Sequence, residues 1–471
     1  IFKMKKTNEE IKIKRKFKLK PVYTIMISFA SLIFIGAIFL YCPFSLNEGV
    51  KINFLDALFT SVTSATVTGL VSLPNGVAAT FNITGRIIIS ILIQLGGLGA
   101  ATLTVLIFLI TSKKLSLSEQ SLIKETWNLR NYKSIKRIFY YIILITFSVE
   151  IIGMFFSFLD FRYIQKLPLA DSFGYAFFHS LSAFNNAGID ILGTTSLISY
   201  QKDSYLSILT ALLIIIGGLG YFSIVDIVSN KFNFKKFSLH TKIVLTYSLA
   251  LILFGWLMIY LCELTNKETN VSGVGAFFMS VSTRTAGFTT YDLSKFNYGT
   301  IVIMMILMFV GASPGGTGGG VKTTGIAVLF AYIRGVMTSK KPHLYKRSLS
   351  DSLFKRALLV IALGGILFIA GTTIICLFEG DYNYIKDGIK YKEYVQGANR
   401  FGSLDIAFDT MSAFATVGLS TGITPYLENG SKIVLMIIMY IGRIGPLTVS
   451  TVFKPKNNQN VFYVEEDISI G

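Results

Sequence analysis

The sequence predicts an all-α membrane protein made of four similar helical repeats in one chain. Of its 471 residues, 52% are hydrophobic and 15% are charged, whereas soluble globular proteins carry about 25% charged residues. Apolar runs at 22–41, 87–110 and 357–378 are long enough to cross a bilayer core of about 30 Å, which takes about 20 helical residues. These runs argue against a large soluble protein with buried helices.

Positive charge alternates with the apolar runs along the chain. The net charge is +18, and 29 of the 44 basic residues lie in five segments: 3–20, 113–137, 231–242, 334–356 and 454–456. This alternation follows the positive-inside rule for multi-pass membrane proteins and differs from the single basic face of a nucleic-acid-binding protein. We therefore expect a lipid bilayer around the chain, no nucleic acid as partner, and cytoplasmic N- and C-termini.

One segment recurs four times around a single glycine, at 55–70, 174–189, 273–288 and 404–419. Each copy has Phe ten residues before the glycine, a small residue five before it and an apolar residue directly after it. Agreement of this kind within one sequence indicates an internal repeat. The four glycines are Gly69, Gly188, Gly287 and Gly418. The phenylalanines are Phe59, Phe178, Phe277 and Phe408, and the small residues are Ser64, Ala183, Ser282 and Ala413.

Each recurring segment lies between two apolar helices and begins with a short helix of about ten residues, which cannot span a bilayer. The short helix must therefore enter the membrane and return on the same side. The predicted unit is helix, pore helix, glycine turn and helix, and four units give pseudo-fourfold symmetry around a central pore. The predicted segments are a cytoplasmic basic N-terminus at 1–20, repeats at 21–112, 113–230, 231–340 and 341–453, and a cytoplasmic C-terminal tail at 454–471.

The second helix of each unit also contains glycine. Residues 94–100 resemble residues 216–221, and their glycines are typical of close helix packing in membranes. Residues 310–316 resemble 441–447, with Gly311 and Gly442 both 24 residues after their central glycine.

The four glycine turns have the chemistry of a cation filter. Backbone at membrane depth must be hydrogen-bonded or must line water or ions, and carbonyl oxygens can replace the hydration shell of K⁺. Glycine allows the positive φ that turns successive carbonyls toward one axis. Re-entrant turns of another transporter are the alternative. The predicted filter residues are Thr66, Val67, Thr68, Gly69, Asn185, Asn186, Ala187, Gly188, Arg284, Thr285, Ala286, Gly287, Ala415, Thr416, Val417 and Gly418. The side chain of Arg284, the one basic residue among them, need not face the pore.

The third repeat carries a glycine-rich run at 311–325 within its second apolar segment. It departs from a phosphate-binding loop because Val321 separates Gly320 from Lys322. One proline and six glycines within ten residues break a helix, and a broken helix at membrane depth must line a cavity or be buried. A mobile loop across the pore is our interpretation, and a simple kink is the alternative. The predicted gate residues are Gly311, Ser313, Pro314, Gly315, Gly316, Thr317, Gly318, Gly319, Gly320, Lys322 and Arg443.

Arg443 lies within the last apolar helix, at 433–449. An arginine at the centre of a membrane helix costs about 2.5–3.5 kcal/mol on insertion scales. It is interpreted as an electrostatic barrier below the filter, and the alternative is a snorkelling or structural arginine paired with an acid such as Glu150 or Asp226.

Together these motifs resemble the Trk/Ktr/HKT superfamily of K⁺ transporters, and within it the Ktr membrane subunit (KtrB type). The resemblance rests on the four filter segments, the stretches 182–188 and 282–288, the glycine-rich loop and the arginine of the last helix. It covers nearly the whole chain. It implies K⁺ uptake in a bacterial plasma membrane through a filter whose carbonyls are the only metal ligands. Some Na⁺-selective plant relatives have Ser at the position of Gly69, so glycine favours K⁺.

The resemblance also implies partners and control. The family's membrane subunit is a homodimer, with one pore per protomer and a cytosolic ring of nucleotide-binding regulatory subunits (KtrA/KtrC type). It implies no cofactor on this chain, no enzymatic activity and Na⁺ as an activator, although the sequence shows no Na⁺ site. The family's intramembrane gate corresponds to the loop at 311–323 and its barrier arginine to Arg443, and the tail is expected at the dimer interface. Two other functions remain open: the ion-binding subunit of an ATP-driven K⁺ pump, and a Na⁺-selective relative.

Overall fold

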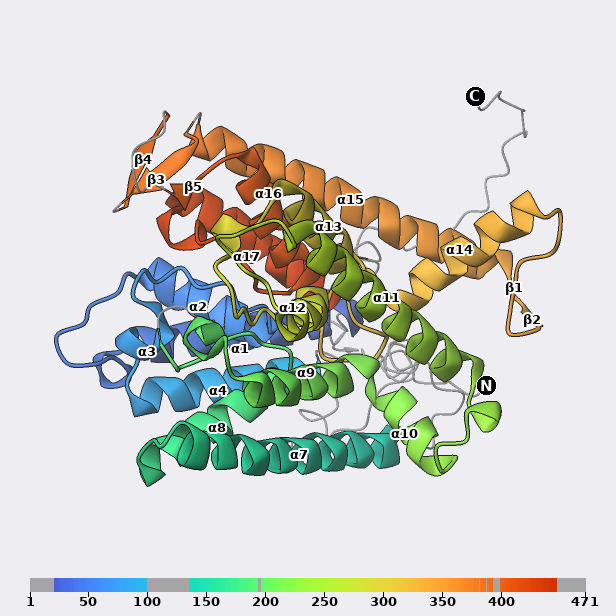
Figure 1. The fold of residues 1–471 in the computed structure, drawn as a ribbon, viewed down its shortest axis with the longest axis horizontal. Coiled ribbons are helices and arrows are strands. Elements are labelled where there is room, and N and C mark those ends of the chain that lie inside the picture. Colours follow the sequence, from blue (N-terminus) through green and yellow to red (C-terminus); the bar gives the residue numbers. More distant parts are fainter. Residues whose placement is uncertain are drawn as a thin grey trace, which may run out of the picture.

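The computed structural model describes residues 21–99, 135–193, 196–380, 382–386, 388–392 and 399–446 (Figure 1). Both predicted chain ends, at 1–20 and 454–471, lie outside these residues. Residues 100–134, where the predicted first repeat ends and the second begins, also lie outside them. Within the described residues, the same order of three helices recurs four times.

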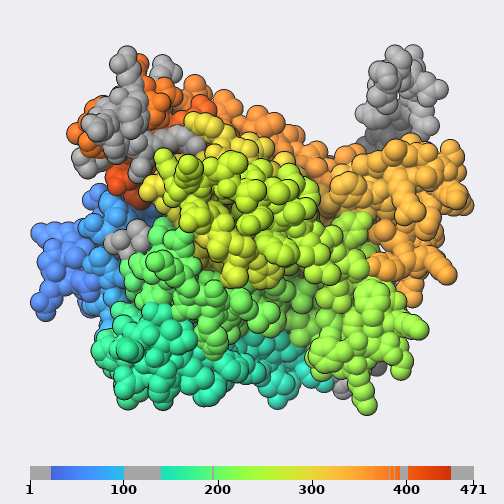
Figure 2. All heavy atoms as spheres, in the orientation of Figure 1, coloured from blue at the N-terminus to red at the C-terminus, as the bar shows by residue number. Residues whose placement is uncertain are grey.

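The first helix of each repeat is the longest. In the part of the chain that the structure describes, four helices are long and apolar enough to cross a membrane. A fifth span is formed if the helices Ser204–Leu219 and Tyr221–Ser229, which are bent by 94° where they meet at Gly220, are counted as one. They carry many exposed large apolar side chains, such as Ile366 and Ile369, which suits contact with lipid. In Figure 1, α7 and α15 run along opposite edges of the molecule, and Figure 2 shows the repeats packed into one body. The long helices are α1 (Pro21–Tyr41), α7 (Ile135–Leu159), α11 (Leu239–Glu263) and α15 (Asp351–Glu379).

The second helix of each repeat is short and buried. These helices have 13 to 16 residues, and at 1.5 Å per residue they are shorter than the bilayer core. Each packs against the two helices that flank it in the chain. The short helices are α2 (Phe54–Thr66), α8 (Leu169–Phe184), α12 (Gly273–Thr285) and α16 (Ser403–Ala415).

The third helix of each repeat joins one repeat to the next. α4 packs against α8, α9 against α12 and α13 against α16, and α17 returns to pack against α2 of the first repeat. The four repeats therefore form a closed circle in chain order. The third helices are α4 (Ile83–Leu98), α9 (Ser204–Leu219), α13 (Tyr298–Phe309) and α17 (Asn429–Ile444), with α10 (Tyr221–Ser229) after α9 and α14 (Thr323–Met337) after α13.

Close packing of the third helices on the short helices depends on three glycines. A Cβ on Gly96, Gly217 or Gly442 would lie 1.9, 1.9 or 2.1 Å from a carbonyl oxygen near the end of that repeat's own short helix. Gly311 does not share this role, since its Cβ would meet the carbonyl of Gly319 at 2.2 Å. The predicted pairing of Gly311 with Gly442 is therefore wrong. Equal spacing of 24 residues does not give equal positions, because α13 ends at Phe309 and a loop follows it.

Short strands and helical turns connect the helices. β3 (Tyr384–Lys386) pairs antiparallel with β4 (Ile389–Tyr391) and β5 (Asn399–Arg400), and β1 (His343–Leu344) pairs with β2 (Arg347–Ser348) at the other end of the molecule in Figure 1. The chain is thus mostly helical rather than all-α. An Asp-Gly pair at 387–388 between aromatic and β-branched residues was the sequence signal for the missed β3–β4 hairpin. Short helical turns cover Pro43–Ser45, Gly76–Thr80, Asp160–Ile164, Ser196–Tyr200, Phe234–Lys236, Leu293–Lys295 and Thr424–Tyr426.

Gly442→Ala should lower the melting temperature of the purified protein in detergent. Its methyl group would collide with the Phe414 carbonyl at 2.1 Å, and overpacking of this kind costs about 1–3 kcal/mol. Gly365→Ala on α15 is the matched control, since no atom lies within 4 Å of its Cβ position and alanine favours a helix by up to about 1 kcal/mol. Equal melting temperatures for the two variants would contradict this account of the packing.

Candidate functional site

The four central glycines contact one another in a closed ring. A Cβ on Gly69 would lie 2.5 Å from the carbonyl oxygen of Ala187, next to Gly188, and one on Gly188 would lie 2.3 Å from that of Ala286, next to Gly287. A Cβ on Gly287 would lie 2.2 Å from the carbonyl oxygen of Val417, next to Gly418. A Cβ on Gly418 would lie 2.0 Å from that of Thr68, next to Gly69. All four glycines have positive φ, between 63° and 103°. Glycine is therefore required at each position both by backbone conformation and by space.

The carbonyl groups of this ring have no hydrogen-bond donor. Each glycine and the residue before it are buried, and among the described residues none of their eight carbonyl oxygens accepts a hydrogen bond. Buried backbone acceptors are nearly always paired with protein or with water. Oxygens left free around one ring can instead coordinate a cation that has lost its hydration shell. The residues before the glycines are Thr68, Ala187, Ala286 and Val417.

Three of the four turns contain a left-handed residue one or two positions after the short helix. Val67, Asn186 and Thr416 have φ of 56°, 59° and 51°. The next N–H in each turn reaches back to the helix, as in Thr68 N to Thr63 O at 2.8 Å, which is the Schellman pattern of helix ends. Asn tolerates this conformation, whereas for β-branched Val and Thr it is strained. Such strain persists where the surrounding structure holds the residue in place.

The third turn is one residue shorter. Helix α12 continues to Thr285, and Ala286 has φ −117°, so no left-handed residue precedes Gly287. Ser282 donates to the Phe288 carbonyl at 2.5 Å, as Ser182 does to the Ile189 carbonyl at 2.6 Å. Ser182 stands six residues before its glycine and Ser282 only five.

This shift corrects two sequence assignments in the third repeat. The buried phenylalanine there is Phe278, which has no exposed surface, and Phe277 is only partly buried. Ser282 is the counterpart of Ser182 and not of Ala183. Counting residues back from the glycine fails because one residue is missing between the helix and the turn.

A hydroxyl group anchors each turn, and the sequence analysis did not single these residues out. Gly69 N donates to the Thr63 hydroxyl and Gly418 N to the Ser412 hydroxyl, each at 2.9 Å. In the other two turns, the serine hydroxyl donates to the carbonyl directly after the glycine. The sequence signal for these residues was a serine or threonine in every repeat, six residues before the glycine in three repeats and five before it in the third.

Three of the remaining predicted filter residues, Thr66, Asn185 and Ala415, are fully buried, and the Thr66 hydroxyl lies 2.7 Å from that of Thr68 in the ring. Thr66 donates to the Val62 carbonyl at 2.7 Å, and Asn185 donates to Glu150 at 2.8 Å. Ala415 is the last residue of α16 and is fully buried.

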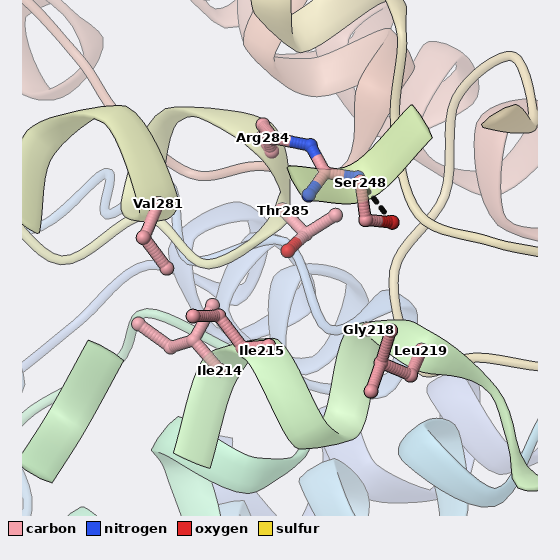
Figure 3. A pocket seen from close by; sticks show the side chains of 8 residues that line it. All are labelled: Ile214, Ile215, Gly218, Leu219, Ser248, Val281, Arg284 and Thr285. Carbon is pink, nitrogen blue, oxygen red and sulfur yellow. Dashed lines mark hydrogen bonds between the residues drawn. The ribbon is translucent and has the colours of Figure 1, made fainter. Parts of the chain in front are cut away.

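Arg284 points away from the ring into a small cavity. Its side chain reaches Ser248 of α11 at 3.4 Å, and Figure 3 shows it above the Gly218–Leu219 end of α9. The arginine is only 7% exposed, and its Nε has no hydrogen-bond partner. The prediction that this side chain need not face the ring agrees with this orientation.

The glycine-rich segment forms a loop and not a kink. Between α13 and α14, Gly311 N donates to the Val321 carbonyl at 3.0 Å and closes the base of the loop. The loop then follows the end of α9: Ser313 N and Thr317 N donate to the carbonyls of Gly218 and Gly217 at 3.1 and 3.2 Å. The alternative of a simple kink is thereby excluded.

The tip of the loop contacts the ends of three short helices. Gly319 N donates to the Thr416 hydroxyl at 2.8 Å, and Thr317 donates to the carbonyl of Phe184 at 3.4 Å. A Cβ on Gly318 would lie 2.7 Å from the Thr285 methyl group. The loop therefore lies directly against the second, third and fourth turns, with no room for larger residues.

Two basic side chains hold the loop. Arg443 donates to the carbonyls of Thr317 and Gly96, and to that of Gly97 at 3.3 Å. Lys322 donates to the Gly318 carbonyl at 2.7 Å.

The predicted alternative of an ion pair between Arg443 and Glu150 or Asp226 is wrong. Glu150 accepts from Asn185, and Asp226 accepts from Asn230 at 2.8 Å. The end of α17 places the guanidinium among backbone carbonyls instead.

The family model TrkH, described as cation transport protein, matches residues 2–462. The Ktr system potassium uptake protein B of Bacillus subtilis is 33% identical over 99% of this chain and 100% of its own length. The potassium/sodium uptake protein NtpJ of Enterococcus hirae is also 33% identical, over 96% of this chain and 98% of its own. The crystal structure of the potassium transporter TrkH from Vibrio parahaemolyticus matches with a TM-score of 0.67 and 17% identity, covering 94% of this chain and 86% of that one, and supports the fold alone.

Ser412→Ala should destabilise the protein, because it leaves the buried N–H of Gly418 without its acceptor at 2.9 Å. Such a loss costs about 1–3 kcal/mol and should lower the melting temperature in detergent. Ser412→Thr is the control, since it keeps the hydroxyl and copies Thr63 of the first turn. If Ser412→Ala and Ser412→Thr have the same melting temperature, the hydroxyl does not anchor the turn.

Proposed function

The chain belongs to the TrkH family of cation transport proteins, and we propose that it takes up K⁺ across the plasma membrane through a filter of backbone carbonyls. The single observation that carries the proposal is the closed ring of four glycine turns whose buried carbonyls have no donor. Potassium is named in the Bacillus subtilis relative, and potassium and sodium are named in the Enterococcus hirae relative; both align over nearly their full length.

The four turns together build a pseudo-fourfold pore from one chain. Each repeat contributes the carbonyl of its glycine and of the residue before it. The C-terminal ends of the four short helices precede these turns, and the negative end of a helix dipole favours a cation. Selectivity for K⁺ then depends on keeping these carbonyls at a fixed spacing, which the contacts between neighbouring glycines support.

The loop between α13 and α14 is the gate. It lies against three of the four turns, and Arg443 and Lys322 hold it by donating to its carbonyls. Both groups also place positive charge next to the path of a cation, which raises the barrier while the loop is closed. Opening requires the loop to leave Thr416 and the end of α9.

Control comes from a second protein. The relative in Bacillus subtilis is named as part of a Ktr system, which supports a transporter of more than one component. We expect a homodimer of this chain above a cytosolic ring of nucleotide-binding regulatory subunits, with no cofactor on the chain itself. Na⁺ is proposed as an activator, in line with the potassium/sodium name of the Enterococcus hirae relative.

Two other functions, an ATP-driven pump subunit and a Na⁺-selective transporter, can be distinguished from this one by experiment. An ATP-driven pump subunit would need its ATPase for any flux, so passive K⁺ flux in liposomes that contain this chain alone or with its regulatory ring would exclude it. A Na⁺-selective transporter would restore Na⁺ rather than Rb⁺ uptake to a bacterium that lacks K⁺ uptake. The full-length match to potassium uptake proteins favours the gated K⁺ transporter.

Gly69→Ser should lower the preference for Rb⁺ over Na⁺ by about tenfold or more, equivalent to about 1.4 kcal/mol. Gly69 has φ 103°, and its Cβ would lie 2.5 Å from the Ala187 carbonyl oxygen, so a serine must displace the ring. The measurement is uptake of both ions by cells that lack their own K⁺ transporters. Gly49→Ser is the control, because Gly49 also has positive φ but has no atom within 4 Å of its Cβ position. Unchanged selectivity in a folded Gly69→Ser protein would remove this glycine from the filter.

Arg443→Gln should raise K⁺ flux without the regulatory partner by about tenfold. Hydrogen bonds from a charged group are worth about 1.5–3 kcal/mol. The substitution removes both the positive charge and the charge-assisted hydrogen bond to the Thr317 carbonyl. Flux into liposomes is measured beside Arg334→Gln, which changes an exposed arginine at the end of α14. A folded variant with equal or lower flux would argue against Arg443 as part of the gate.

A further inference from the structure

Arg284 is a buried cation whose hydrogen-bond donors are mostly unused. Its side chain is 7% exposed, and its guanidinium forms one hydrogen bond with the described residues, from Nη2 to the Ser248 hydroxyl at 3.4 Å. Its Nε is fully buried and has no acceptor. A guanidinium has five N–H donors and is always charged. Most of these donors therefore have no acceptor in the part of the chain that the structure describes.

The helices around Arg284 offer it no carboxylate. α12 packs against α9, α11 and α13, and among these four helices the one acidic residue is Glu263 at the end of α11. Glu263 lies 15 residues after Ser248, which is about 22 Å along a helix. Its carboxylate already accepts from Thr269 and Thr300. Arg284 accordingly forms no ion pair with any described residue.

The guanidinium faces a small cavity between α9, α11 and α12 (Figure 3). The centre of a water-sized sphere can move within about 10 Å³ there, which is room for one monatomic ion or one water molecule. The Ser248 hydroxyl lines the same cavity and donates to no acceptor among the described residues. The other polar side chain of the wall is Thr285, and the apolar ones are Ile214, Ile215, Leu219 and Val281.

The charge of Arg284 needs compensation at this position. A buried ion without a partner is strongly unfavourable. The carbonyl end of α12 offsets part of the charge, because Arg284 lies in its last turn and a helix end carries about half a negative charge. The helix end does not supply an acceptor for Nε and does not fill the cavity. A bound anion would do both.

We infer that this cavity binds a chloride ion, held by the Arg284 guanidinium and the Ser248 hydroxyl. Charge-assisted hydrogen bonds to an anion are among the strongest in proteins, and a monatomic anion accepts them from any direction. Two donor side chains and an apolar wall do not provide the many donors that a phosphate or sulfate requires. The inference goes beyond K⁺ transport and does not depend on it.

A chloride here would also change the electrostatics of the glycine ring. Arg284 lies three residues before Gly287 and two before Ala286, whose carbonyl belongs to the ring. In a low-dielectric interior a positive charge acts over a longer range than in water. If the ring holds K⁺, as proposed above, the bound chloride reduces the repulsion between Arg284 and that ion.

The test is the melting temperature of the purified full chain in detergent, in potassium gluconate and in potassium chloride at the same K⁺ concentration. Gluconate is too large for the cavity. We expect chloride to raise the melting temperature of the native protein by about 2 °C or more, because an ion that binds only the folded state stabilises it. K⁺ is equal in both salts, so the result is independent of whether the ring binds K⁺.

Three variants assign the chloride response to this cavity. Arg284→Met removes the charge but keeps a long side chain, and replacing a buried ion by an apolar residue is often neutral for folding, so this protein should fold and lose the response. Ser248→Ala removes one donor and should raise the chloride concentration for the half-maximal effect by about tenfold, equivalent to about 1.4 kcal/mol. Arg334→Met changes an exposed arginine at the end of α14 and should keep the full response.

Bromide locates the ion directly. In crystals grown in potassium bromide, anomalous scattering should place one bromide ion beside the Arg284 guanidinium. A water molecule at this position without an anomalous signal would overturn the inference. Equal melting temperatures of the native protein in gluconate and chloride would also overturn it, and so would a chloride response that Arg284→Met retains.

Discussion

The structure depends on a ring of buried carbonyl oxygens that accept no hydrogen bond from the described residues. Four glycine turns meet in chain order, each so close to the next that a side chain at any glycine would collide with its neighbour. Every larger feature serves this arrangement. The short helices end at the turns, the hydroxyls of residues such as Thr63 and Ser412 hold the turns, and the third helices pack each repeat against the next.

The third repeat differs from the others both at the ring and beside it. Its turn is one residue shorter and lacks the left-handed residue that Val67, Asn186 and Thr416 provide. Its third helix stops at Phe309 and gives way to the loop. The shorter turn and the loop lie next to each other, because Gly318 of the loop packs against Thr285 at the end of α12. Under the proposed function, this repeat keeps ion coordination through its glycine and adds control through its changed surroundings.

The loop is hydrogen-bonded to backbone and hydroxyl groups that support the glycine ring. Its N–H groups use the carbonyls at the end of α9 and the hydroxyl of Thr416, and its own carbonyls are taken by Arg443 and Lys322. These are polar contacts within an otherwise apolar region, where exchange for other partners is costly. Such a loop has few alternative positions, which suits the proposed gate, because a gate changes between defined states.

The sequence by itself determined the apolar spans, the four glycines and the glycine-rich break, because hydrophobic length, backbone freedom and helix breaking are local properties. It predicted most of the helical order and the residues of the ring. It could not place Phe278 rather than Phe277, separate Gly311 from Gly442, or choose a partner for Arg443. Those depend on one missing residue, on where a helix ends, and on carbonyls from segments hundreds of residues apart.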